Sequence, residues 1–270
     1  MPLTEVAYAK INLALHIRKR REDGYHELET LFAFVDQGDV LTAASAAQDS
    51  LTVSGEFAPQ LADPFGNIVA RALGKLPRPG GLRINLEKRL PVAAGLGGGS
   101  ADAGAVFRLV RDMHGLPDDW HQRAAALGAD VPACVESRAC VGRGTGTDLM
   151  PIGNDLAGTA VLLVNPRVPL STAAVFKAWD GTDRGAMPHG SASHIAIAGR
   201  NDLAQPAISL CPTIADVLSA LAETDCLMTR MSGSGATCFA LYRSHDVMRA
   251  SAEKLATRHP DWWQMAGALR

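Results

Sequence analysis

Several patterns that would place a chain in a known class are missing from this sequence. Its five cysteines are odd in number and form no Cys-x-x-Cys pair, so neither a disulfide framework nor a zinc knuckle is indicated. Its eight histidines show no His-Glu-x-x-His or His-x-x-x-His spacing, and no internal repeat is present. These absences argue against disulfide-stapled domains, the common zinc sites and repeat arrays.

Long hydrophobic runs and an excess of one charge are missing as well. No stretch reaches the length of a membrane span, and Glu5 and Lys10 interrupt any apolar run of the signal-peptide type. The formal net charge of -2 argues against a nucleic-acid binder that neutralises phosphates, and the basic cluster at residues 18–21 is typical of a solvated turn. We therefore expect a cytoplasmic protein with no membrane or nucleic-acid partner.

What the chain has is the composition of an ordinary globular protein, 47% hydrophobic and 20% charged over 270 residues. This length allows one large domain or two moderate ones.

The chain is organised around a glycine-rich stretch from Leu90 to Asp102, LPVAAGLGGGSAD. Four glycines in the five positions 95–99 remove the Cβ atoms, so the backbone can approach a ligand closely. Alternation over residues 82–86 predicts a strand before it, and helical spacing over 103–113 predicts a helix after it. Because the N–H groups of a glycine loop and a helix start bind anions, this stretch is interpreted as a phosphate-binding loop.

Two better-known phosphate loops do not fit this stretch. A Walker A loop ends in Gly-Lys-Ser/Thr, which is missing, and the dinucleotide fingerprint needs glycine where Ser100 stands. A flexible linker is the remaining alternative, but the flanking strand and amphipathic helix disfavour it.

The N-terminal segment 6–17 alternates between apolar and polar residues and predicts a strand. Lys10 and Asn12 are neighbours on its polar face, roughly 7 Å apart. A lysine in mid-strand usually faces solvent, so a functional role for Lys10 is the alternative. After an Asp-Gly turn signal, Tyr25 and His26 either contact a planar ligand or cap the sheet edge.

Asp130 stands between Gly128, a predicted helix C-cap, and Pro132, so we expect it in a fixed, non-helical turn. A turn aspartate most often satisfies nearby backbone N–H groups, and a catalytic base is the sharper alternative.

Other elements follow from periodicity and turn residues. Strands are expected at 28–41 (one or two), 51–53, 160–165, 227–231 and 237–242, and helices at 67–76, 118–127, 171–179, 212–223 and 244–257. From residue 160 to the end near 262–263, apart from one extra helix, this is the βαββαβ order of a ferredoxin-like domain. Residues 180–199 give no readable pattern.

Three motifs stand in order along the chain, and together they are far more specific than any one alone. They are Ala-Lys-Ile-Asn-Leu at 9–13, Pro-x3-Gly-Leu-Gly-Gly-Gly-Ser at 91–100 and Ser-Gly-Ser-Gly-Ala at 232–236. With them the chain resembles the GHMP kinase superfamily. The segments at 23–26, 127–132 and 175–177 resemble those members that phosphorylate the 2-hydroxyl of 4-diphosphocytidyl-2-C-methyl-D-erythritol, in the methylerythritol phosphate route to isoprenoids.

The resemblance implies an α+β GHMP kinase fold with two domains. Residues 1–155 would form an ATP-binding domain resembling ribosomal protein S5 domain 2, and residues 156–270 a ferredoxin-like domain. It also implies ATP as phosphoryl donor, Mg²⁺ entering with ATP on unidentified protein ligands, and Lys10 and Asp130 as the catalytic pair. The implied ATP-binding residues are Asn67, Lys88, Val92, Ala93, Ala94, Gly95, Leu96, Gly97, Gly98, Gly99, Ser100, Ala101 and Asp102, and the implied substrate-binding residues are Asn12, Tyr25, His26, Thr172 and Phe176.

These roles suit phosphoryl transfer, which needs positioning and charge stabilisation more than covalent help. A carboxylate can take the proton of the accepting hydroxyl, while a lysine beside both stabilises the developing oxyanion and keeps the carboxylate ionised. Tyr25 and Phe176 can sandwich a pyrimidine whose edge His26 reads through hydrogen bonds.

Two other functions stay open on the sequence. One is a GHMP kinase acting on a mevalonate-type or sugar substrate, against which the Gly-Tyr-His turn argues. The other is a non-catalytic ATP-binding sensor on the same fold, which would not need both Lys10 and Asp130.

Overall fold

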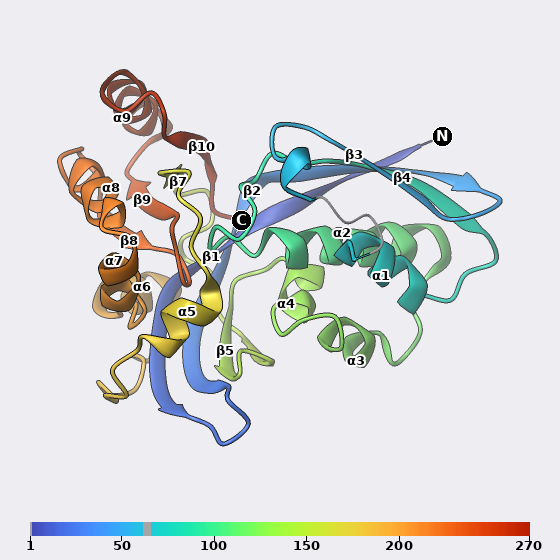
Figure 1. The fold of residues 1–270 in the computed structure, drawn as a ribbon, viewed down its shortest axis with the longest axis horizontal. Helices are drawn as coiled ribbons and strands as arrows, with labels where there is room; N and C mark the ends of the chain where they lie inside the picture. Colours follow the sequence, from blue (N-terminus) through green and yellow to red (C-terminus); the bar gives the residue numbers. More distant parts are fainter. Residues whose placement is uncertain (1, 62–65) are drawn as a thin grey trace. The chain divides into compact units, whose positions relative to one another are not determined.

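The computed structural model describes residues 2–61 and 66–270, which form two compact units (Figure 1). The first unit takes the chain up to Lys10, then Gly38–Val92 and Gly97–Ser137, and the second takes Ile11–Gln37, Ala93–Leu96 and Arg138–Arg270. The long strands β1 (Leu3–Arg20) and β2 (His26–Ala46) therefore contribute residues to both units.

β1 confirms the predicted N-terminal strand and extends it at both ends, but the polar side chains in its middle are not in solvent. Lys10, Asn12 and His16 are 5%, 2% and 1% exposed. Their burial is tolerated because each bonds to other polar groups, and buried polar groups without partners are costly. β2 is a single strand over the region where one or two were expected.

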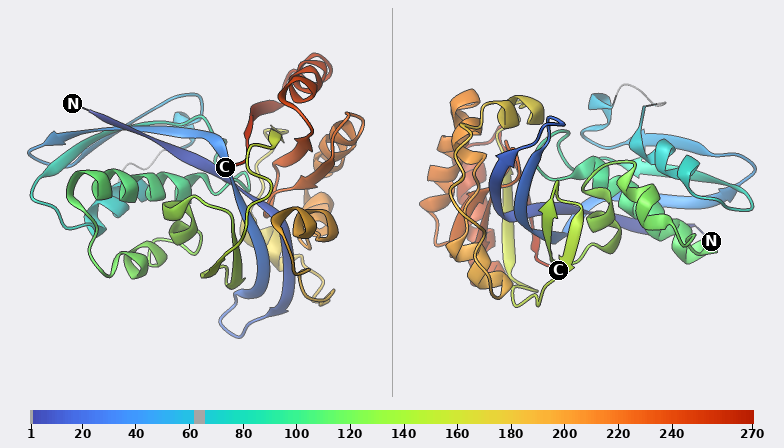
Figure 2. Two further views of the ribbon diagram at one scale, coloured as in Figure 1. Left: turned by 180° about the vertical axis from the view of Figure 1, so that it is seen from behind. Right: turned by 90° about the horizontal axis from the view of Figure 1, so that it is seen from below.

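In the first unit, β3 (Ser50–Ser54) pairs in parallel with β4 (Gly81–Glu87), which pairs antiparallel with the second half of β2. Four helices lie on one side of these strands (Figure 2). They are α1 (Ile68–Lys75), α2 (Gly98–His114), α3 (Trp120–Ala125) and α4 (Val131–Glu136). A 3-10 turn, η1, covers Ala58–Gln60. α2 packs against both α1 and α4, and most of its first half is buried, which fixes its N-terminus within the unit.

In the second unit, the first half of β2 pairs antiparallel with β5 (Cys140–Gly144), and β5 pairs with β6 (Asp148–Pro151). A separate antiparallel sheet has the order β10 (Trp263–Ala268), β7 (Ala160–Asn165), β9 (Cys238–Tyr242), β8 (Met228–Met231). Numbered along the chain, these strands are arranged 4-1-3-2, which confirms the predicted ferredoxin-like order.

One face of that sheet is covered by α8 (Thr213–Ala222) and α9 (His245–Arg258) (Figure 1). Ile214 and Val217 from α8 and Leu255 from α9 join Leu162 and Tyr242 of the strands in one buried core. The remaining helices of this unit are α5 (Thr172–Lys177), α6 (Ala192–Ala198) and α7 (Ala204–Leu210).

The sequence patterns do not predict three short helices, α4, α6 and α7. α6 falls in 180–199, and the other two lie where no element is expected. These helices have only six or seven residues, too few for helical periodicity to stand out. Residues 43–66 are rich in Ala, Ser, Gln and Pro, and four of them, 62–65, lie outside the described residues. Over the described ranges, no helix combines the length and apolar composition needed to cross a bilayer.

Candidate active site

The predicted phosphate loop leads directly into α2, which begins on the glycines at Gly98 and not near residue 103. Periodicity misplaced this start because glycines have no side chain to detect. Gly97, the N-cap, has a left-handed φ of 60°, and a Cβ there would lie 2.9 Å from Lys10 Cε. The first helical bond runs from Ala101 N to Gly97 O, at 2.8 Å. The N–H groups before it have no partner within the helix, so the start of α2 is suited to an anion.

Lys10 and Asp130 are brought together in the first unit, with 3.0 Å between Lys10 Nζ and Asp130 Oδ2. The lysine side chain is 6% exposed and the carboxylate 31%, so the pair is buried on one side and accessible on the other. This contact removes the solvent-facing alternative for Lys10.

Asp130 lies in a turn, as expected, but its φ and ψ of -83° and -12° are in the helical region, which was not expected. It is the N-cap of α4 and makes no side-chain capping bond. Pro132 lies in the first turn of α4, where a proline loses no hydrogen bond. The Asp130 carboxylate therefore forms an ion pair with Lys10 and does not cap the backbone of α4.

Other residues of the first unit lie around the start of α2. A Cβ on Gly128 would be 3.9 Å from Ser100 Oγ, and one on Gly99 would be 3.6 Å from Ile68 Cγ2. Asn67 caps α1 by accepting the N–H two residues along the chain, at 2.9 Å. Ser100, in the first turn of α2, thus lies close to Gly128, two residues before Asp130, and Gly99 lies close to Ile68, the residue after Asn67.

Lys88 lies in a buried ionic cluster. Its Nζ donates to Asp39 and, at 2.9 Å, to Asp102 Oδ2, and all three side chains are 3% exposed or less. Burial, with the charge of Asp39, raises the pKa of Asp102 well above its usual range in spite of Lys88. Burial alone would lower the pKa of Lys88, but the two carboxylates outweigh it and raise that pKa. Sequence reasoning missed Asp39, which belongs to none of the quoted motifs.

In the second unit, His26 is part of an aromatic cluster. Its ring centroid is 5.0 Å from that of Phe176 and 5.6 Å from that of Trp179. Burial, and then the positive charge of Arg20, lower the pKa of His26 and favour the neutral imidazole. Trp179 had been predicted only as the end of a helix. In contrast, the Tyr25 side chain at the hairpin tip is 65% exposed, which leaves it accessible to a ligand.

Asn12 and Thr172 both contact the third glycine motif, the turn at 232–236. The Asn12 backbone N–H donates to Ser232 Oγ at 3.2 Å, and Thr172 Oγ1 lies 2.9 Å from Ser234 Oγ. The Asn12 side-chain amide donates to Thr30 Oγ1 at 2.8 Å.

The same turn holds the part of the phosphate loop that belongs to the second unit. Ser232 Oγ donates to Gly95 O at 2.7 Å, and Thr237 N donates to Ala94 O at 3.2 Å. A Cβ on Gly95 would lie 2.3 Å from Ser232 O, so only glycine fits there. The sequence resemblance assigns no role to the motif at 232–236. Its bonds to Ala94 and Gly95 show that it positions this part of the phosphate loop.

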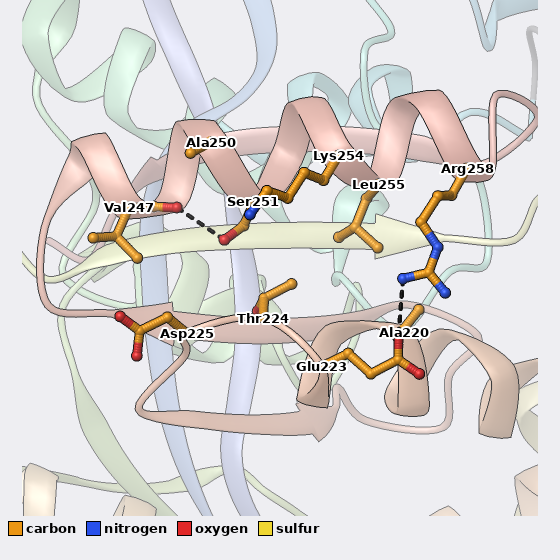
Figure 3. Close-up of a pocket in the computed structure, with 10 residues that line it drawn as sticks. All are labelled: Ala220, Glu223, Thr224, Asp225, Val247, Ala250, Ser251, Lys254, Leu255 and Arg258. Atoms are coloured by element: carbon orange, nitrogen blue, oxygen red, sulfur yellow. Dashed lines mark hydrogen bonds and ion pairs between the residues drawn. The ribbon is translucent and has the colours of Figure 1, made fainter.

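Two further features do not add to this site. In the described part of the chain, no three His, Cys, Asp or Glu side chains are grouped so that they could hold a metal ion. A cavity of about 370 Å³ lies between α8 and α9 (Figure 3), and the residues that line it belong to none of the three motifs.

Comparison with known proteins places these observations in a family. Residues 66–138 match the family model described as the GHMP kinases N-terminal domain, and residues 190–261 match that of the GHMP kinases C-terminal domain. The chain is 67% identical over 270 residues to a 4-diphosphocytidyl-2-C-methyl-D-erythritol kinase of Novosphingobium aromaticivorans, covering 100% of this chain and 94% of the relative. It is 63% identical over 272 residues to the enzyme of that name from Erythrobacter litoralis, covering 99% and 100%.

Solved structures agree. A crystal structure of 4-(cytidine 5'-diphospho)-2C-methyl-D-erythritol kinase is 32% identical, with a TM-score of 0.79 over 99% of both chains. The mevalonate kinase of Methanococcus jannaschii shares the fold, at 11% identity and a TM-score of 0.64 over 100% of this chain and 98% of its own.

Proposed function

Because this chain belongs to the GHMP kinases and, among them, to the 4-diphosphocytidyl-2-C-methyl-D-erythritol kinase family, we propose the corresponding reaction for it. The enzyme transfers the γ-phosphoryl group of ATP to the 2-hydroxyl of 4-diphosphocytidyl-2-C-methyl-D-erythritol, a step toward isoprenoid precursors. A mevalonate-type or sugar substrate is disfavoured, since the mevalonate kinase structure shares the fold at only 11% identity.

The observation that carries this proposal is the Lys10–Asp130 pair, with 3.0 Å between Nζ and Oδ2. It lies in the same unit as the start of α2, and a Cβ on Gly97 would lie only 2.9 Å from Lys10 Cε. A sensor that only binds ATP would not need a half-accessible carboxylate held by a buried lysine beside a phosphate loop.

The chemistry follows from these groups. The accepting hydroxyl oxygen forms a bond to the γ-phosphorus, the bond from that phosphorus to the bridging oxygen breaks, and ADP leaves. Asp130 accepts the proton of the hydroxyl, while the Lys10 ammonium stabilises the negative charge that develops on the oxygen.

The N–H groups at the start of α2 bind the transferring phosphates. Their partial positive charge and fixed direction stabilise phosphate charge without reorganisation during the reaction. Asn67, at the cap of α1, and Lys88 lie near the adenine in this proposal.

His26 and Phe176 recognise the cytosine, and Tyr25 closes on it from its exposed position. The neutral His26 ring accepts the Arg20 Nε–H on its Nε2 at 3.4 Å, which leaves its Nδ1–H to donate to an acceptor on the cytosine edge. Asn12 and Thr172 bind polar groups of the same substrate. We keep the division at residues 155 and 156 as the proposed boundary between an ATP-binding segment and a ferredoxin-like one.

Mg²⁺ enters with ATP in this proposal. Kinases hold this ion with one or two carboxylates plus the substrate phosphates, so a cage of protein ligands is not required. Asp102 Oδ1 is a buried carboxylate oxygen without a hydrogen-bond partner in the described residues, and is the candidate protein ligand. When bound, the ion neutralises charge on the β- and γ-phosphates.

An assay of ADP release tests the function directly. The purified protein is given ATP with 4-diphosphocytidyl-2-C-methyl-D-erythritol, mevalonate or homoserine in parallel. We expect turnover with the first substrate and only background with the others. Equal turnover with mevalonate, or ATP binding without turnover on any of them, would contradict the proposal.

A further inference from the structure

The ionic cluster of Lys88, Asp39 and Asp102 has a second set of bonds that connects it to the phosphate loop. Asp39 is completely buried, and its Oδ1 accepts the backbone N–H groups of Arg89 at 2.6 Å and Leu90 at 2.8 Å. Its Oδ2 accepts from Lys88. One carboxylate therefore binds three consecutive residues at the point where β4 ends and the glycine-rich stretch begins.

The other end of the stretch is tied to the same cluster. Asp102 lies near the start of α2, and its Oδ2 accepts from Lys88 Nζ at 2.9 Å. A Cβ on Gly98 would be 3.5 Å from Lys88 Nζ and 3.8 Å from Asp39 Oδ2, so the first residue of α2 lies directly against the ion pair. The entry to the loop and the start of the helix are thus held by three side chains of the first unit.

This arrangement matters because the phosphate-binding groups proposed above are backbone N–H groups. A backbone donor cannot adjust by rotating a side chain, so its direction depends on how the two ends of the loop are fixed. A displacement of about 1 Å in a positioning element can cost about 100-fold in rate. Burial of all three groups also favours a rigid arrangement, since buried charges are tolerated only when they are paired.

We propose that Asp39 is a positioning residue for ATP, which acts through Lys88 and the backbone N–H groups of Arg89 and Leu90 to hold the loop and the start of α2 in phosphate-binding geometry. This inference rests on the proposed function of the loop. In it Lys88 acts as the link between the two ends of the loop, and its charge is shared by Asp39 and Asp102.

Asp39→Asn is the direct test, because the amide keeps the size of the side chain and an oxygen for the two backbone donors. Its NH₂ group, however, faces the Lys88 ammonium, so the ion pair is lost. We expect the Kd for ATP, measured by equilibrium titration, to rise about tenfold or more. The KM for the cytidine substrate should stay within about twofold, because that substrate's base is bound elsewhere.

Asp49→Asn is the matched control. Asp49 likewise binds a cation, Arg78, and one backbone N–H of β4, that of Leu82 at 2.9 Å, but at the opposite end of the strand from the loop. We expect its Kd for ATP to equal that of the wild type. If both variants lower the melting temperature and neither changes the Kd for ATP, Asp39 is merely structural and the proposal is wrong.

A second pair of variants covers the case in which Asp39→Asn does not fold because Lys88 is left partly unpaired. Lys88→Met and the double variant Asp39→Asn/Lys88→Met remove the buried cation. The two variants should have about the same weakened affinity for ATP. Lys88→Met alone already removes the cation that joins Asp39 to Asp102, so the second substitution should add little. Wild-type ATP affinity in the folded double variant would overturn the proposal. Because ATP binding is measured without turnover, a failure of the proposed phosphoryl transfer in the wild type would be seen separately.

Discussion

In the first unit, the two lysines of the predicted site are held by ion pairs with carboxylates. In the second unit, the predicted substrate residues are uncharged side chains held by hydrogen bonds and ring contacts, one of these bonds coming from Arg20 Nε to His26 at 3.4 Å. Lys10 pairs with Asp130, and Lys88 with Asp39 and Asp102. In the second unit Asn12 bonds to Thr30, Thr172 lies beside Ser234, and His26 lies among aromatic rings.

The difference corresponds to what each region is proposed to bind. Triphosphate chemistry moves negative charge, and buried ion pairs provide fixed charges in a medium where they are strong. A pyrimidine base is neutral, so hydrogen bonds and ring contacts can bind it without an ion pair. The first region should therefore respond to mutation mainly in kcat and ATP affinity, and the second mainly in the KM of the other substrate.

The largest effect is expected for the catalytic pair. Asp130→Asn keeps the size of the side chain but removes the base, so kcat should fall by about 10²–10⁴-fold. Lys10→Ala should cost a similar factor, and the double variant should be little worse than either single one, because groups that act together are non-additive. Steady-state kinetics at saturating concentrations of both substrates measure this.

Near-full kcat in Asp130→Asn would return this carboxylate to a structural role. A double variant whose loss equals the product of the two single losses would falsify the coupled pair. Either result would also weaken the contrast between the two regions, because the Lys10–Asp130 ion pair would then have no catalytic role.

The next largest effect is expected on kcat/KM for ATP when Gly97 of the phosphate loop is replaced. Gly97→Ala places a Cβ 2.9 Å from Lys10 Cε at a φ of 60°, so both the loop and the lysine must shift. We expect kcat/KM for ATP to fall about 10–100-fold. Gly144→Ala is the control, since its φ of 67° imposes a similar backbone strain but a Cβ there would have no atom within 4 Å. If the two variants lose activity equally, backbone strain and not contact with Lys10 is responsible.

Most of the fold could be predicted because its elements have strong periodicity. β7 was predicted at its observed bounds, and the ferredoxin-like order followed from the strands and helices after residue 160. The starts of α2 and α4 were not predicted. In both places the chain uses residues that carry no apolar pattern, glycines in one case and a proline in a first helical turn in the other.

For the site, the sequence supplied the motif residues but not the contacts between them. The ion pair of Lys10 and Asp130 joins residues 120 positions apart (130 minus 10), a contact that no local pattern reveals. Asp39 was missed because a single aspartate in a strand has no motif, and Trp179 because its spacing is that of an ordinary helix. Ser232 was in a quoted motif, but its bond to Gly95 depends on the tertiary fold.

A smaller effect is expected for His26, one of the predicted substrate residues of the second unit. His26→Ala removes a ring that contacts Phe176 and the proposed hydrogen bond to cytosine, so the KM of the cytidine substrate should rise about tenfold. The KM for ATP should not change. His245→Ala, at the exposed start of α9, removes the same type of side chain away from the site and should change neither constant. Equal shifts of both constants in His26→Ala would mean that His26 is structural.

The smallest effect separates a histidine proposed to bind substrate from one that only supports the fold. His16 is 1% exposed, its Nε2 accepts the Arg200 N–H at 3.1 Å, and its Nδ1 lies 3.3 Å from Gly185 O. These bonds require the neutral ring with its proton on Nδ1. Burial, and then the charge of Arg200, lower the pKa of His16 below its ordinary value of about 6.5.

Because the pKa of His16 is lower in the folded state, the unfolded chain binds more protons once the pH falls below about 6.5. This histidine therefore makes the free energy of unfolding decrease as the pH falls through that window, and contributes no pH dependence above it. In the His16→Gln variant the side chain at this position does not titrate. The difference in the free energy of unfolding between wild type and variant, measured by denaturant titration, should therefore become smaller from pH 7 to pH 5. The KM of the cytidine substrate at pH 7.5 should be the same in both proteins, in contrast to His26→Ala. Parallel stability curves would show that His16 is not the titrating group, and a raised KM would place it with the substrate residues instead.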